Sequence, residues 1–124
     1  MDRALLGNGA RVVQWDLWGA ENQRFYPERL PDGSYRLIAD HSRKVLEVLN
    51  ASLANGAPIQ QWDWHGGANQ RFHLELLTSA HRIRAVHSGK VLDVSGGGKS
   101  NGTPIVQWDW HGGRNQRWLV GGVT

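Results

Sequence analysis

The chain has 124 residues, enough for one domain with one hydrophobic core and too few for a second sizeable core. Apolar residues make up 40% of the chain and charged residues 20%, which excludes a disordered polar chain, and no apolar run reaches the roughly 18 residues that a membrane-spanning helix needs. The lack of cysteine excludes disulfides, thiolate metal sites and a cysteine nucleophile, and the basic excess (14 Lys and Arg against 11 Asp and Glu) is too scattered to indicate nucleic acid or membrane binding.

The first clear pattern in the chain is a twelve-residue motif at 14–25, which reads Gln-Trp-Asp-Leu-Trp-Gly-Ala-Glu-Asn-Gln-Arg-Phe. The residues before it lack the apolar stretch and cleavage site of a signal peptide. The motif returns 47 residues later at 61–72 and a further 46 residues later at 107–118. The second and third copies agree at ten of the twelve positions, so the chain is built from internal repeats.

Short strands are predicted along the second repeat. Runs of alternating or continuous apolar residues, separated by glycine-containing turn signals, occur at Arg36–Ala39, Val45–Leu49, Pro58–Trp62 and Arg71–Leu76. A helix over Arg43–Leu53 is disfavoured by β-branched Val45 and Val48, and the equivalent third-repeat segment runs into three glycines at 96–98. We therefore predict an all-β chain.

The strand pattern continues into the third repeat, where residues 81–94 align with residues 35–48. Three units of about 46 residues with four strands each predict a closed three-fold barrel, the β-trefoil, since a propeller needs at least four blades. A solenoid remains a weaker alternative. We expect a single domain over 1–124, with repeats near 1–32, 33–78 and 79–124.

The first repeat aligns only from its third strand onward, so we expect it to lack its first two strands. An open barrel exposes strand edges. We therefore expect self-association, or an upstream segment or domain that completes the barrel.

A Gln-x-aromatic triplet closes each motif copy: Gln23-Arg24-Phe25, Gln70-Arg71-Phe72 and Gln116-Arg117-Trp118. With these triplets at constant spacing, essentially the whole chain resembles the ricin B-chain-like, or R-type, β-trefoil lectins and carbohydrate-binding modules. The resemblance implies a non-catalytic module that acts outside the cell and binds galactose-type or xylan-type glycans. Neither the residues nor the resemblance chooses between these sugars.

The resemblance also assigns a sugar-binding set to each repeat. The third repeat ranks first because its carboxylate is the usual Asp, although Val106 replaces the common Gln, whereas the second repeat has the longer Glu. The first repeat has no matching carboxylate. The sets are Asp93, Val106, Trp108, Asn115 and Gln116 in the third repeat, Glu47, Gln60, Trp62, Asn69 and Gln70 in the second, and Trp15, Asn22 and Gln23 in the first.

These residue types suit a pyranose, which has a face of C–H bonds and a rim of hydroxyl groups. A tryptophan ring can stack on the face, while a carboxylate and amides bind the rim. Both Asp93 and Glu47 must then be partly exposed. Shallow sites of this kind bind on the order of 0.1 to 1 mM.

Other repeated residues are interpreted as structural. Trp64 and Trp110 indicate packing, since Leu17 stands at the same place in the first copy. The aromatic residues that end the motif are expected in the core. The aspartates that follow the stacking, or platform, tryptophans (Trp15, Trp62 and Trp108) are expected in turns. The Asn-Gln pairs are expected to have either a structural or a binding role. The residues concerned are Phe25, Phe72 and Trp118, then Asp16, Asp63 and Asp109.

Catalysis and cofactors find little support. A glycosidase needs two carboxylates about 5 to 10 Å apart, and each repeat offers one. His41, His65, His87 and His111 recur with the repeat but lack the close spacing of a metal site, although His65 and His111 could touch a sugar. The alternative to a lectin is a trefoil for protein interaction, or a toxin accessory, whose sugar sites have decayed.

Overall fold

The computed structural model describes residues 25–39, 42–78, 80–97 and 104–119. Trp15, Asn22, Gln23, Asp16, Leu17 and His41 lie outside these ranges, and so does the part of the first repeat for which missing strands were expected. No helix within the described ranges is long and apolar enough to span a membrane.

The described residues form strands joined by turns, which confirms the predicted all-β chain. The eight strands are β1 (Phe25–Arg29), β2 (Tyr35–Ala39), β3 (Val45–Val48), β4 (Ile59–Trp62), β5 (Phe72–Leu76), β6 (His81–Ala85), β7 (Val91–Val94) and β8 (Ile105–Trp108). Four single 3₁₀ turns accompany them: η3 (Leu49–Ala51), η4 (Ala68–Gln70), η5 (Ser95–Gly97) and η6 (Arg114–Gln116).

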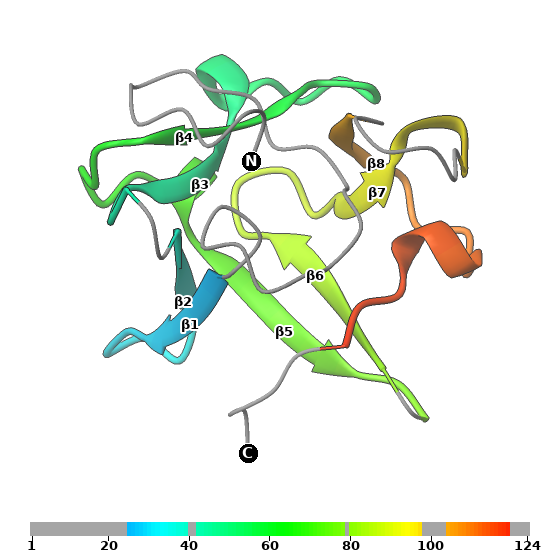
Figure 1. Ribbon diagram of the computed structural model, residues 1–124, viewed down its shortest axis with the longest axis horizontal. Helices are drawn as coiled ribbons and strands as arrows, with labels where there is room; N and C mark the ends of the chain where they lie inside the picture. The colour runs from blue at the N-terminus through cyan, green and yellow to red at the C-terminus, as the bar shows by residue number, and fades with distance from the viewer. Residues whose placement is uncertain (1–24, 40–41, 79, 98–103, 120–124) are drawn as a thin grey trace.

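All pairings between these strands are antiparallel, in the order β4-β3-β2-β5-β6-β7-β8, and β1 pairs with β2. The β3–β4 and β7–β8 hairpins lie on opposite sides of the molecule, with the long β5–β6 hairpin between and below them (Figure 1). Tyr35 pairs with Phe72 in the second repeat, and His81 pairs with Trp118 in the third. The fourth strand of the third repeat is thus reduced, within the described residues, to a single bridge.

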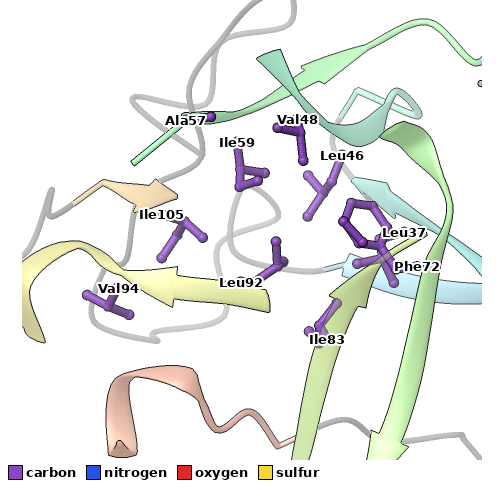
Figure 2. Packing of buried hydrophobic residues seen from close by; sticks show 11 residues of the cluster. Leu37, Leu46, Val48, Ala57, Ile59, Phe72, Ile83, Leu92, Val94 and Ile105 are labelled. Carbon is purple, nitrogen blue, oxygen red and sulfur yellow. The ribbon is translucent and has the colours of Figure 1, made fainter. Parts of the chain in front are cut away.

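The buried apolar side chains of the strands meet in one cluster (Figure 2). Phe72 is fully buried in it, while Phe25 and Trp118 are partly buried and pack against it. The Trp118 indole N–H donates to the Leu92 carbonyl at 3.2 Å, which satisfies the only polar group of that ring. The predicted core role of these three aromatic residues is confirmed.

The second and third repeats use different residues at the same turns. Arg43, Asn50 and Ala51 have φ values of 64°, 51° and 51°, whereas the equivalent third-repeat positions are Gly89, Gly96 and Gly97, also with positive φ. A side chain in the left-handed region costs free energy that glycine does not incur. The turn geometry is therefore imposed by the fold, and only the third repeat has glycine at all three positions.

Candidate functional site

The second and third repeats each bury one carboxylate at the same place. Glu47 lies on β3 opposite Gln60, and Asp93 lies on β7 opposite Val106. Their relative exposures are only 5% and 3%, so the expectation that both are partly exposed was wrong. Burial is tolerated because protein donors replace water around each carboxylate with charge-assisted hydrogen bonds.

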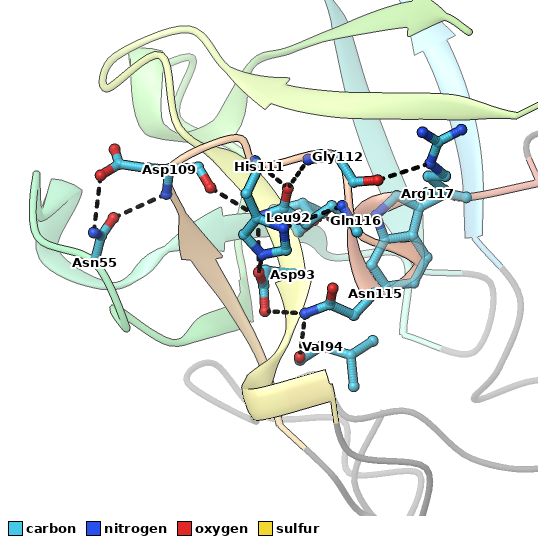
Figure 3. Close-up of polar contacts among 12 residues, drawn as sticks. Asn55, Leu92, Asp93, Val94, Asp109, His111, Gly112, Asn115, Gln116 and Arg117 are labelled. Carbon is cyan, nitrogen blue, oxygen red and sulfur yellow. Dashed lines mark hydrogen bonds and ion pairs between the residues drawn. The ribbon is translucent and has the colours of Figure 1, made fainter. Parts of the chain in front are cut away.

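The motif glutamine is the central donor in both sites. Gln116 Nε2 donates to Asp93 Oδ2 at 2.9 Å and to the Asp109 carbonyl at 2.8 Å, while its Oε1 accepts from the His111 amide at 2.8 Å (Figure 3). Gln70 makes the same three bonds to Glu47, to the Asp63 carbonyl and to the His65 amide. Both glutamines are fully buried and use both amide hydrogens within the protein. The geometry therefore favours the structural interpretation of these two residues, which hold the carboxylate and the following loop in place.

The neighbouring asparagine differs between the repeats. Asn115 Nδ2 donates to both Asp93 Oδ1 and the Val94 carbonyl, each at 3.1 Å. Asn69 Nδ2 donates to the Val48 carbonyl at 3.0 Å. The second carboxylate oxygen of Glu47 instead accepts from Gln60 Nε2 at 2.7 Å.

A histidine covers each carboxylate on the solvent side. His65 Nε2 lies 3.4 Å from Glu47 Oε1, and His111 Nε2 lies 3.6 Å from Asp93 Oδ2, with both imidazoles half exposed. The amides of Gly67 and Gly113 donate to Nδ1 of the respective ring at 3.1 Å. Because Nδ1 accepts a hydrogen, the neutral ring carries its own hydrogen on Nε2, directed toward the carboxylate.

The glycine that follows makes this histidine conformation possible. A Cβ at Gly67 or Gly113 would lie 2.6 Å from Cε1 of the histidine two residues earlier, which no real side chain allows. The repeated His-Gly-Gly sequence is thus the signal that could have placed the histidines over the carboxylates. Within the described ranges, no three His, Asp or Glu side chains gather as a metal site requires.

The expected platform tryptophans end their strands at the surface. Trp62 ends β4 and Trp108 ends β8, with relative exposures of 38% and 41%. Trp64 is also 38% exposed, although the Arg36 guanidinium lies 5.2 Å from its ring centre, and Arg82 lies 5.1 Å from the Trp110 ring. Trp64 thus has a packing partner, but its exposure does not distinguish it from Trp62.

The aspartates after the platforms pair with lysines from the preceding hairpin. Lys44 Nζ contacts Asp63 Oδ1 and Lys90 Nζ contacts Asp109 Oδ1, both at 2.6 Å. The pKa of Asp109 is lowered, first by the hydrogen bond from Lys90 and then by that from Asn55. Such exposed pairs add little to stability. They do give both aspartates a partner within the protein, in agreement with a structural role.

Comparisons with known proteins agree with this architecture. A profile described as "Ricin-type beta-trefoil lectin domain-like" matches residues 2–62, 32–108 and 68–124. A search of curated proteins finds no similar sequence. Among solved structures, the designed three-fold symmetric protein ThreeFoil is 39% identical over 95% of this chain and 85% of its own, with a TM-score of 0.92. These matches confirm the predicted β-trefoil.

Two natural proteins extend the comparison. The chain is similar to 1,3Gal43A, an exo-β-1,3-galactanase from Clostridium thermocellum, at 29% identity and a TM-score of 0.89, over 93% of this chain and 25% of the galactanase. It also shares its fold with the C-half of an earthworm R-type lectin solved with GalNAc, at 17% identity and a TM-score of 0.69, over 94% of this chain and 82% of that one. The chain thus spans a quarter of the galactanase.

Proposed function

Because the chain belongs to the ricin-type β-trefoil lectin domain-like family, we propose that it is a non-catalytic carbohydrate-binding module with one shallow sugar site in each complete repeat. The family and the similarity to the earthworm R-type lectin support carbohydrate binding in general. The number of sites, their residues and the sugar class are the proposal.

One observation carries the proposal: in both repeats an exposed tryptophan ends the strand that pairs with the strand of the buried carboxylate. The residue two positions before the tryptophan, Gln60 or Val106, lies directly opposite that carboxylate. The ring offers a flat apolar surface to the C–H face of a pyranose. A sugar hydroxyl both donates and accepts, so one hydroxyl could accept from the histidine Nε2–H and donate to the carboxylate oxygen beside it. The 3.4 and 3.6 Å separations between these groups exceed an ordinary N–H···O distance, which leaves both able to bind a hydroxyl.

Glycans of the galactose type or the xylan type are the proposed ligands. The galactanase and the GalNAc-bound lectin support the galactose type by similarity. A glycosidase would need two carboxylates that act on one sugar, whereas Asp63 and Asp109 beside the platforms pair with Lys44 and Lys90, and this supports binding without catalysis.

A glycan array with the wild-type chain and the variants Trp108→Ala and Trp62→Ala tests the proposal. Each variant should weaken binding, and the double variant should abolish it, because the stacking surface is lost while the buried carboxylate network remains. Trp64→Ala is the matched control, since its exposure equals that of Trp62 but its ring packs against Arg36. If a folded wild-type chain bound no galactoside or xylan fragment, the proposal would fail.

A protein-interaction module is the second candidate function. The deep burial of Glu47 and Asp93 favours it, because a protein side chain already donates to each oxygen of both carboxylates. The glycan array separates the two candidates, since a protein-binding trefoil would bind no glycan with or without its tryptophans.

A further inference from the structure

The platform of the third repeat has a neighbour from the second repeat. Trp108 ends strand β8, and along one edge β8 pairs with β7, which places Asp93 opposite Val106. On its other edge, the Gly56 amide donates to the Gln107 carbonyl at 2.9 Å, and the Gln107 amide donates to the Ala57 carbonyl at 3.0 Å. Side chains alternate along a strand, so Val106 and Trp108 share a face. Strand β8, which ends at Trp108, therefore lies between β7, which carries Asp93, and the segment 52–57.

The segment 52–57 is fastened to the third repeat at several points. Gln107 Nε2 donates to the carbonyls of Ser52 and Ala54, both at 2.8 Å. The Asn55 side chain donates to Asp109 Oδ2 and accepts from the Asp109 amide, both at 3.0 Å (Figure 3). These bonds fix the position of the segment beside the platform.

Gly56 is the point at which this segment reaches the tryptophan ring. It is exposed and has a φ of +88°, and a Cβ built on it would lie 3.7 Å from Cζ3 of Trp108. The Asn-Gly pair at 55–56 recurs in the sequence at 8–9 and 101–102, each time six residues before the Gln-Trp-Asp motif. Because residue 56 is a glycine, it places no side chain beside this part of the Trp108 ring.

We propose that an oligosaccharide bound at Trp108 leaves the platform over Gly56, so that the second repeat determines which glycans the third-repeat site accepts. This inference rests on the proposed function. A pyranose whose hydroxyl rim is held on the Asp93 side directs its opposite rim toward Gly56, where the next sugar residue would pass. The preferred ligand is then an oligosaccharide of two or more pyranoses, with Gly56 as a specificity-determining residue.

The variant Gly56→Asn tests this by building a wall at the exit. Asparagine tolerates positive φ better than most residues, and a Cβ at 3.7 Å from the ring is an ordinary contact. Gly33→Asn is the matched control, because Gly33 has the same φ of +88° with nothing within 4 Å of its Cβ position. Affinities for D-xylose and xylotriose, and for D-galactose and a β-linked galactotriose, are measured by NMR on the indole N–H signal of Trp108.

Gly56→Asn should lower trisaccharide affinity by about fivefold or more and change monosaccharide affinity by less than about twofold. Gly33→Asn should change neither. Equal losses for both ligand sizes, or no loss for either, would overturn the inference.

A wild-type measurement covers the case in which Gly56→Asn fails to fold. The amide signals of Asn55 and Gly56 should shift with a trisaccharide and stay unchanged with the monosaccharide. Equal shifts with both ligands would refute this inference and leave the proposed function intact. If the wild-type Trp108 signal responds to no sugar, the proposed function itself fails at that site.

Discussion

The second and third repeats build the same site with different residues around the carboxylate. In the second repeat, Gln60 donates to the longer Glu47, and Asn69 is left to bond only the backbone. In the third repeat, the side chain of Val106 has no hydrogen-bond donor, and Asn115 donates to the shorter Asp93 instead. The length of the acid and the residue opposite it thus compensate for each other, while the glutamine and the histidine keep their places. Each departure from the family pattern, Glu47 in the second repeat and Val106 in the third, is thus matched by a change in which amide donates to the carboxylate.

The largest effect is expected from removing the shared glutamine. Gln116→Leu should destabilise the protein by about 3 kcal/mol, because it leaves a buried carboxylate oxygen without its donor. Gln70→Leu should cost about as much, and the exposed Arg114→Ala on the same turn as Gln116 should cost little. Denaturant unfolding measures all three. A cost well under about 1 kcal/mol for either leucine variant would mean that the network does not support the fold.

Replacing Gln60 and Glu47 by their third-repeat equivalents, Val and Asp, tests whether the acid and the residue opposite it compensate for each other. Gln60→Val should cost about 2 kcal/mol, since Glu47 Oε2 loses its charge-assisted bond. Adding Glu47→Asp should recover part of this loss, because it recreates the third-repeat combination in which the asparagine reaches the acid. A double-mutant cycle from denaturant unfolding gives the coupling. Strictly additive costs would show that the two positions are independent.

The turn positions offer a smaller contrast. Gly97→Ala should destabilise by about 1 kcal/mol, because its φ of 68° strains a side chain even though nothing lies within 4 Å of its Cβ position. Ala51→Gly, at the equivalent position, should stabilise by about 0.5 kcal/mol, since glycine relieves strain but loses more entropy on folding. Thermal unfolding compares the two. Effects of the same sign would contradict the equivalence of the turns.

The smallest effect concerns the acid stability of the β5–β6 hairpin. Hydrogen bonds from Arg84 and then Arg82 lower the pKa of Glu75 from 4.5 to about 2. A lowered acid pKa adds stability that is complete above pH 4.5 and lost as the pH falls through about 2. Because the side chain is about one-third exposed, we expect about 0.5 kcal/mol after solvent screening.

Its equivalent, Glu28, contacts Arg36, and Ile38 stands where the third repeat has Arg84. Glu75→Gln should therefore flatten the decrease in stability between pH 5 and pH 2.5 more than Glu28→Gln does, as measured by urea unfolding. Equal effects of the two variants would show that the second arginine adds nothing.

Much of the fold followed from periodicity. A motif repeated at constant spacing predicts equivalent strands, and Phe72 and Trp118 take equivalent places at the core. The same periodicity brought Glu47 together with Gln60 and Gln70, and Asp93 with Asn115 and Gln116, as the resemblance implied.

Other features could not be read from the repeat. The near-complete burial of both carboxylates, the fixed tautomer of the histidines and the exposure of Trp64 depend on which donor reaches which oxygen or ring within a fraction of an ångström. Sequence alignment orders residues along the chain and carries no such distances.

The sequence by itself determined the β-trefoil, its core aromatic residues and, in the second and third repeats, which amides lie beside the carboxylate, because strand alternation and repetition are local properties of the chain. Only the tertiary structure decided which of those side chains form hydrogen bonds within the protein and which face solvent. It also placed the segment 52–57 of one repeat beside Trp108 of the next. Contacts between repeats depend on how the sheet closes, and closure is a property of the whole barrel.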